Sequence, residues 1–254
     1  MQARFRQYVP SIRGAFLPGL AWDGIEARRH GLTLPQWYAA RGAQLHLLPS
    51  LEILRDGLLL DIGANVGDWT ACALAVEPSA KVIAAEPGDS PRASLERRFA
   101  GDHRVTIIPK AVARESGHQT FHLTQHSHNG SLKPPRNMDE YYGHGWRVAD
   151  VVDVETTTVD ELSAGRPVAV LKIDVQGAEQ EVLAGADETL RRTAAVLLEV
   201  TFVSHYEEDA GFTLLDSHLR ELGFELVGLS EPFKSKKGIV LWCDACYVPS
   251  DTLA

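Results

Sequence analysis

The apolar positions of this chain follow a repeating order of short apolar runs and helical patterns, which begins at Leu58. The run 58–61 is apolar up to an acidic last residue, as in a buried strand, whereas Phe212, Leu215 and Leu219 recur on one face of a helix. Strands that alternate with helices build βαβ units and a largely parallel sheet. We therefore expect an α/β fold with strands at 58–61, 81–86, 105–108, 168–174 and 195–200, followed by an antiparallel hairpin of strands at 224–229 and 239–247.

Two stretches interrupt this order. Residues 1–55 contain helical patches, such as 45–54, but no strand pattern, so we expect an N-terminal helical cap. Residues 117–158 begin with the alternation of a strand and continue, from 125 to 150, as a segment rich in His, Gly, Pro, Asn and aromatic residues. Long insertions of this kind are usually functional loops, so we expect a substrate lid there. The remaining chain, 56–254, is predicted to be one domain that carries this lid.

Charge and hydropathy narrow the choice of partners. The chain of 254 residues has a formal net charge of −9 and an isoelectric point near 5.6. Because it lacks the positive field that attracts nucleic acid and anionic membranes, we expect neither as a partner. No stretch approaches the roughly 20 apolar residues that span a bilayer, and no signal-peptide core is present, so the cytoplasm is the expected location. Length and composition leave a homodimer open.

A glycine-rich turn lies between the first predicted strand and the helix after it. Residues 61–67 have the sequence DIGANVG. Glycines allow a sharp turn and a close approach of the helix to a ligand, and asparagine tolerates a left-handed backbone. The GxGxxG dinucleotide fingerprint is absent, because Asn65 stands in place of its second glycine. An acid at the strand end suits a cationic amino-acid group better than a phosphate, so we predict a nucleoside ligand with such a group, held by Asp61, Gly63, Asn65 and Gly67.

Glu86 closes the second predicted strand, about 20 residues beyond the glycine turn. An acidic side chain at this point can accept hydrogen bonds from both hydroxyls of an adenosine ribose. The same contact serves NAD and S-adenosylmethionine. Glu86, with Pro87 beside it, therefore predicts an adenosine ligand without deciding between these cofactors.

Acidic residues also end the fourth and fifth predicted strands. Asp174 follows the run 168–173, and Glu199 ends the run 196–199. Ligands of open α/β sheets bind at the carboxyl ends of the strands, so both side chains are expected at one crevice. Lys172 points to the same side of the sheet as Asp174, where its ammonium group requires a carboxylate partner. Two interpretations of Lys172 stay open, a catalytic group and a structural ion pair with Asp174.

Taken together, these segments resemble the FkbM-type family of S-adenosylmethionine-dependent methyltransferases. The resemblance covers roughly residues 55–202 and is carried by the turn at 61–67, Glu86 with Pro87, 156–162 (TTTVDEL), 172–179 (KIDVQGAE) and Gly185. It implies a class I methyltransferase domain at 56–254, S-adenosylmethionine bound at the turn, at Glu86 and at Asp174, and O-methylation of a small-molecule or oligosaccharide acceptor such as a sugar, a glycoside or a related natural product. Gln176 departs from the family, which usually has glutamate there, so no charged role carries over to that position.

Methylation of an alcohol requires a group that removes the hydroxyl proton. We predict His144 as this base, because two glycines flank it in the aromatic part of the insertion. The alternatives are His126, His128 and His205.

A divalent ion is a further explanation for the strand-end acids. Asp174 and Glu199 offer the oxygen ligands that Mg²⁺ accepts, and His205 would complete the site. Two other functions also stay open, an NAD-dependent oxidoreductase, which the missing fingerprint disfavours, and a non-catalytic protein that binds an adenosine ligand.

Overall fold

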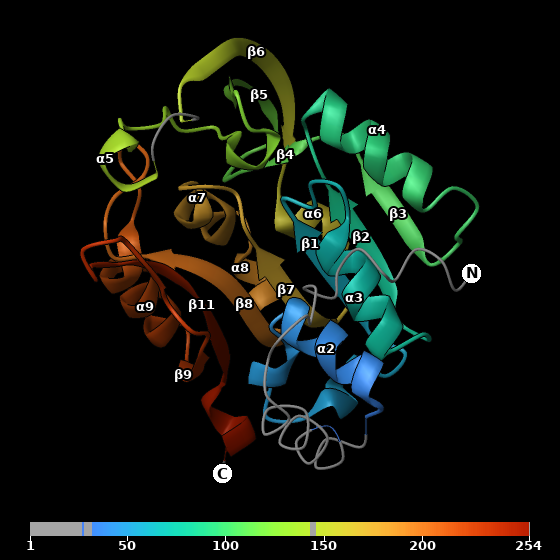
Figure 1. Cartoon of the computed structure of the whole chain (residues 1–254). Helices are drawn as coiled ribbons and strands as arrows, with labels where there is room; N and C mark the ends of the chain where they lie inside the picture. Colours follow the sequence, from blue (N-terminus) through green and yellow to red (C-terminus); the bar gives the residue numbers. More distant parts are fainter. Residues whose placement is uncertain (1–26, 28–31, 143–145, 254) are drawn as a thin grey trace.

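The computed structural model describes residue 27, residues 32–142 and residues 146–253. Helices alternate with strands along the chain, and most of the strands gather into a central sheet with helices on both faces (Figure 1). This arrangement confirms the α/β fold that the apolar runs predicted. Within the described ranges, every helix is too short or too polar to cross a membrane.

The central sheet contains eight strands in the described residues, in the order β10-β11-β8-β7-β1-β2-β3, with β9 also paired to β11. Neighbours from β8 to β3 are parallel, whereas β11 is antiparallel to β8, β9 and β10. The predicted terminal hairpin is therefore confirmed, and β10 adds a short strand within its connection. The bounds are β1 (Leu58–Ile62), β2 (Lys81–Ala85), β3 (Val105–Ile108), β7 (Val168–Ile173), β8 (Thr193–Thr201), β9 (Phe224–Leu229), β10 (Phe233–Lys234) and β11 (Val240–Pro249).

Each face of the sheet buries its own apolar core. Leu59 and Leu60 are neighbours in β1, yet they belong to different cores, because successive side chains of a strand point to opposite faces. One core is covered by α2 (Leu34–Gly42), α3 (Asp68–Val76) and α4 (Asp89–Arg98), and the other by α6 (Val159–Ser163), α7 (Glu179–Ala184), α8 (Asp187–Leu190) and α9 (Gly211–Glu221).

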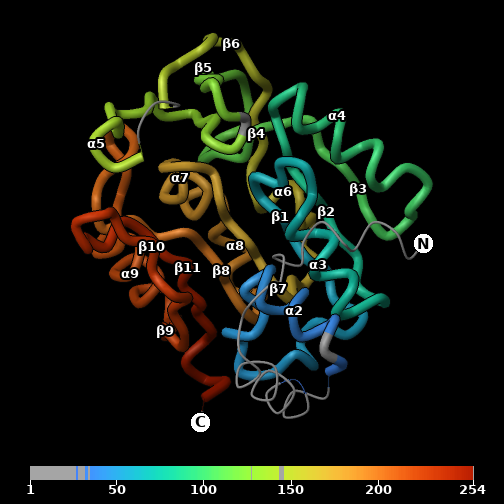
Figure 2. Tube along the Cα trace, viewed as in Figure 1, coloured from blue at the N-terminus to red at the C-terminus, as the bar shows by residue number. Residues whose placement is uncertain are grey.

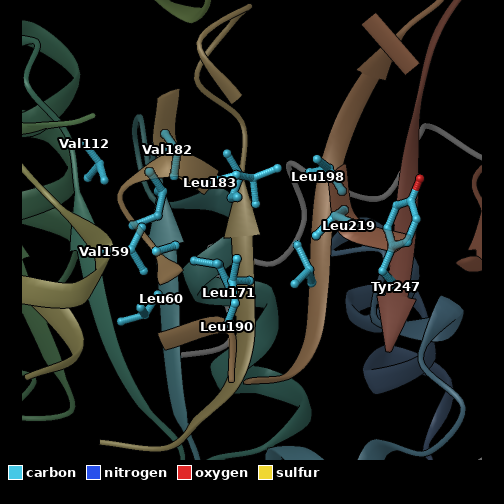
Figure 3. Close-up of a cluster of buried hydrophobic side chains, with 14 of the residues drawn as sticks. Leu60, Val112, Val159, Leu171, Val182, Leu183, Leu190, Leu198, Leu219 and Tyr247 are labelled. Carbon is cyan, nitrogen blue, oxygen red and sulfur yellow. The ribbon is translucent and has the colours of Figure 1, made fainter. Parts of the chain in front are cut away.

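Figure 3 shows the second core, in which Leu60, Leu171 and Leu198 come from three adjacent strands. Helix side chains, such as Val182 of α7 and Leu219 of α9, cover them. With both faces buried, the strands are open only at their ends, so a ligand has to approach at an edge of the sheet.

The described part of the N-terminal cap is helical, as predicted. The helix expected at 45–54 is instead two short 3₁₀ helices, η2 (Leu45–Leu47) and η3 (Leu51–Leu54), because Pro49 between them has no N–H to continue the hydrogen bonding. The indole Nε1 of Trp69 donates to the carbonyl oxygen of Ala43 over 2.9 Å, which fastens the cap to α3.

The insertion, together with β4 just before it, forms a second sheet in the order β4-β6-β5, seen above the central sheet in Figure 2. Strand β5 confirms the predicted alternation, but β6 was not predicted, and it begins inside the segment expected to be a loop. Its residues alternate poorly, and it is built by pairing with β5 along its length rather than by local pattern. The bounds are β4 (Ala111–Val112), β5 (Gly117–Thr124), η4 (Ser127–Asn129), α5 (Asp139–Tyr142) and β6 (Val148–Thr157).

Candidate active site

The turn after β1 lies against the loop after β7. Gly63 has a φ of +78°, and a Cβ at this position would lie 1.9 Å from the carbonyl oxygen of Asp174. Gly67 has a φ of +83°, and its Cβ would lie 2.6 Å from Leu95 Cδ1. Asn65 is also left-handed, with a φ of +48°. The backbone therefore requires glycine at positions 63 and 67 and favours asparagine at position 65.

The Glu86 carboxylate, at the end of β2, joins two loops. Its Oε2 accepts a hydrogen bond from the Asn65 N–H (2.9 Å) and its Oε1 accepts one from the Gly88 N–H (2.8 Å). Burial, with only 6% of the residue exposed, raises the pKa of Glu86 to about 7, and the bonds from Gly88 and Asn65 limit the rise. Each oxygen has a second lone pair, so the carboxylate can still accept the ribose hydroxyls expected from the sequence.

Asp61 and Lys172 form a buried pair beneath the turn. Asp61 Oδ2 accepts from Thr70 Oγ1 (2.6 Å), and its Oδ1 lies 3.2 Å from Lys172 Nζ. Lys172 Nζ also donates to the Gly63 carbonyl oxygen (3.1 Å) and lies 3.6 Å from Asp174 Oδ2. Burial acts to lower the pKa of Lys172, but the charges of Asp61 and Asp174 more than offset it and raise that pKa. These contacts favour the protonated form of Lys172 and place it in an ion pair with Asp61 as well as with Asp174, the partner expected from the sequence.

Two cavities meet at the carboxyl ends of the strands. The larger, of about 510 Å³, extends from Glu86 to Tyr142 and Trp146. The smaller, of about 250 Å³, extends from Lys172 to Gln44 of the cap. The wall that both cavities share is lined by Gly63, Asn65, His128, Asp174, Glu199 and Trp242.

The shared wall carries two acidic side chains, Asp174 and Glu199, and a third acidic residue, Asp244, lines the smaller cavity beside it. Asp174 and Glu199 reach the same crevice, as their strand ends predicted, and the pairing of β8 with β11 places Asp244 directly opposite Glu199. Burial raises the pKa of Glu199 well above its usual value, and the charge of Asp174 raises it further. Burial and then the charge of Asp174 raise the pKa of Asp244 to about 6. Carboxyl groups that raise one another's pKa form a wall that a cationic ligand would stabilise.

Aromatic rings line the far end of the larger cavity. Tyr142 stacks on Trp146 (centroids 5.2 Å apart) and on Phe233 (5.7 Å), and Phe233 stacks on Trp242 (5.5 Å). The Tyr142 hydroxyl lies 3.0 Å from His205 Nε2. The sequence pointed to the aromatic residues of the insertion, but Phe233 and Trp242 were missed, because only the pairing of β10 with β11 places them side by side.

The metal site predicted at Asp174, Glu199 and His205 finds no support in the geometry. Throughout residues 32–142 and 146–253, no group of three or more His, Cys, Asp or Glu side chains could hold a metal ion.

The structure divides the predicted cofactor residues into two groups. Asp61 and Gly67 line neither cavity and support the turn from within. His144, the predicted base, lies outside the described residues. The predicted cofactor residues that line the larger cavity are Gly63, Asn65, Glu86, Pro87 and Asp174.

A largely parallel sheet with a glycine turn after β1, a buried acid at the end of β2 and a crevice at the strand ends defines a class I S-adenosylmethionine-dependent methyltransferase. The fold is similar to that of Methyltransferase FkbM from Methylobacillus flagellatus KT, with a TM-score of 0.51 and 15% sequence identity. The match covers 91% of this chain and 58% of that chain.

Sequence comparison defines the family. The model of the family described as Methyltransferase FkbM domain matches residues 61–226, so the chain belongs to the FkbM family of methyltransferases. It is 29% identical to 2-O-methyltransferase NoeI of Sinorhizobium fredii (strain NBRC 101917 / NGR234) over 164 residues, 60% of this chain and 66% of that protein. It is 28% identical to 31-O-demethyl-FK506 methyltransferase FkbM of Streptomyces tacrolimicus over 213 residues, 74% of this chain and 80% of that protein. The matches to the Sinorhizobium protein and the Methylobacillus structure span less than two thirds of those chains.

Proposed function

We propose that this protein transfers the methyl group of S-adenosylmethionine to a hydroxyl oxygen of a sugar, a glycoside or a related natural product. The observation that carries the proposal is the larger cavity, which joins a carboxylate suited to a ribose, Glu86, to the aromatic rings of Tyr142 and Trp146. The names of the two relatives, a 2-O-methyltransferase and a 31-O-demethyl-FK506 methyltransferase, support a hydroxyl acceptor.

The cofactor would occupy both cavities. We place its ribose at Glu86, its adenine beside Pro87 and Val112, and its amino-acid group in the smaller cavity, near Lys172 and Asp244. S-adenosylmethionine supplies a methyl group activated by a positive sulfonium, and the acidic shared wall suits that charge.

The acceptor would lie against the aromatic rings. Sugar rings have an apolar face of C–H groups, which packs on flat aromatic surfaces, while their hydroxyls require polar partners. Tyr142 and Trp146 belong to the insertion, so this arrangement gives the insertion the substrate-lid role expected from the sequence.

We assign the removal of the acceptor proton to His205. As the bond from the acceptor oxygen to the methyl carbon forms and the sulfur–carbon bond breaks, the hydroxyl proton becomes strongly acidic and passes to the imidazole. Burial lowers the pKa of His205 to about 4, so the ring is neutral and ready to accept a proton at neutral pH. Its Nε2 contact with Tyr142 holds the ring beside the aromatic end of the cavity.

The test is a panel of monosaccharides, oligosaccharides, glycosides and complex alcohols, each incubated with the protein and S-adenosylmethionine. We expect S-adenosylhomocysteine together with a methyl ether product, both identified by mass spectrometry. Glu86→Ala serves as the control variant, because it removes the carboxylate assigned to the ribose. Turnover confined to amines, thiols or RNA would contradict the proposal.

A further inference from the structure

The side chain of Gln176 is held at both ends. Its Nε2 donates to Asp174 Oδ1 over 2.8 Å, and its Oε1 accepts from the Tyr206 hydroxyl over 2.9 Å. Its backbone is also held, since its carbonyl oxygen accepts from Ser131 Oγ at 2.6 Å. The residue has a φ of +59°, an uncommon conformation for a side chain other than glycine or asparagine, which persists where its surroundings fix it.

Asp174 sets the direction of these hydrogen bonds. A carboxylate only accepts, so the amide nitrogen of Gln176 faces Asp174 and the amide oxygen faces Tyr206. The Tyr206 hydroxyl then donates to that oxygen, although the carbonyl oxygen of Asn129 lies 3.1 Å away as a second acceptor. Glutamate at this position would instead place two acceptors against each other.

Tyr206 gives the Gln176 side chain a rigid support. It is 1% exposed, and a Cβ at Gly177 would lie only 2.7 Å from Tyr206 Cβ, so the tyrosine packs directly on the glycine backbone. The series Tyr206, Gln176, Asp174 therefore runs from a buried ring to a carboxylate on the wall that both cavities share.

We propose that Gln176 is a positioning residue that holds the Asp174 carboxylate in a fixed orientation at the shared wall, where its charge stabilises the sulfonium of the cofactor. Without the Gln176 amide, the Asp174 carboxylate keeps Lys172 Nζ, at 3.6 Å, as its favourable contact. The inference rests on the cofactor placement proposed above and is independent of which hydroxyl is methylated.

The first test is the ¹⁵N NMR signal of the Gln176 side-chain amide, identified by its loss in Gln176→Leu or in Gln176→Glu, which has the same shape and no side-chain N–H. We expect this signal to shift in Asp174→Asn, which replaces the charged acceptor of the amide nitrogen by a neutral one, and in Tyr206→Phe, which removes the donor to the amide oxygen. A signal unchanged by Asp174→Asn would overturn the proposal. Tyr206→Phe keeps the ring packing, so it tests the outer link even where Gln176→Leu fails to fold.

The second test compares two ligands by calorimetry, S-adenosylmethionine and S-adenosylhomocysteine, which lacks the positive charge. Gln176→Leu should weaken the first about 5- to 10-fold and the second less than about 2-fold, because only the sulfonium interacts with the carboxylate charge. Gln180→Leu, the same change on the exposed face of α7, is the matched control and should alter neither affinity.

A double-mutant cycle completes this test. The double variant Asp174→Asn with Gln176→Leu should bind S-adenosylmethionine no more weakly than Asp174→Asn alone, because Gln176 acts through Asp174. Equal losses for the two ligands, or additive losses in the cycle, would overturn the proposal. Absence of methylation of every sugar and alcohol would contradict the proposed acceptor and leave these binding results unchanged.

Discussion

At the scale of single residues, Gly63 shows how a backbone atom from a distant part of the sequence determines which residue a position can carry. A glycine in this turn could be predicted from its place between a strand and a helix, because the local pattern carries that information. The atom that excludes a Cβ, the carbonyl oxygen of Asp174, could not be predicted, because it comes from a separate strand.

Comparison of Gly63→Ala with Gly101→Ala separates the cost of a left-handed backbone from the cost of the clash with Asp174. Both glycines are left-handed, with φ of +78° and +79°, but nothing lies within 4 Å of a Cβ at Gly101. We expect Gly101→Ala to lower the free energy of unfolding by about 1 kcal/mol and Gly63→Ala to lower it by more than about 3 kcal/mol. Urea denaturation measures both. Equal losses would mean that the clash with Asp174 is relieved by a small shift of the loop.

His205 is the second residue whose role can be tested directly. His205→Gln should lower the turnover rate about 100-fold and leave the affinity for S-adenosylmethionine nearly unchanged, because a base acts on the transition state. His128→Gln is the matched control, since His128 also lines the larger cavity. With the pKa of His205 near 4, the rate should stay level as the pH falls from about 8 to about 6.

A base with an ordinary histidine pKa would give a different profile. The rate would then fall below about pH 6.5, as the imidazole takes up a proton. A large loss in His144→Gln, together with such a fall, would assign the base to the insertion instead.

At the scale of elements, the sequence predicts strands that bury both faces and misses strands that depend on a partner. β1 and β7 are apolar runs followed by helical patterns, and both lie where they were expected. In β6 the sequence VADVVDVETT mixes apolar and acidic residues, and six of its ten residues are exposed. Pairing with β5 creates this strand, and a local pattern does not contain that information.

The N-terminal cap, which the sequence described only as helical, can be tested through its contact with α3. Trp69→Phe leaves the buried carbonyl oxygen of Ala43 without its donor, so we expect a loss of about 1 to 3 kcal/mol in the free energy of unfolding. S-adenosylmethionine should also bind more weakly, because Trp69 lines the smaller cavity. Thr33→Ala, at the other end of α2, should cost about 1 kcal/mol and leave that affinity unchanged.

At the scale of the whole molecule, strand order explains how much of the site was predictable. Asp174 and Glu199 could be assigned to one crevice, because the carboxyl ends of parallel strands meet at one edge of a sheet. The positions of Asp244 and Trp242 at the same crevice could not be predicted, because they follow from the register of β11 against β8 and β10. Apolar patterns along the sequence locate the strand ends, whereas the register between strands decides which residues of neighbouring strands lie side by side.

Buried carboxyl groups should make the stability of the whole molecule depend on pH. In the folded state, burial raises the pKa of Glu86 and of Glu179 to about 7 and that of Asp244 to about 6. The folded state therefore holds these protons more tightly than the unfolded chain, and stability falls as the pH rises through the folded pKa values. His205, with its lowered pKa, acts in the opposite direction only between about 4 and 6.5.

Between about pH 6.5 and 8, therefore, the cofactor-free protein should lose about 1 to 2 kcal/mol of its free energy of unfolding. Urea denaturation at each pH measures this. Glu86→Gln removes one of the two groups with a pKa of about 7 and should reduce the slope. A stability that rises over the same interval would contradict the assigned pKa values.

The smaller cavity has walls from two parts of the chain, Gly42 and Gln44 of the cap and Lys172 and Asp244 of the sheet. A molecule that fills it touches both, so the free energy of binding also opposes detachment of the cap. Saturation with S-adenosylmethionine or with S-adenosylhomocysteine, which share the amino-acid group, should then protect the link between α2 and β1 from limited proteolysis. The state of the cap would thus report, from outside the crevice, whether the cofactor site is occupied.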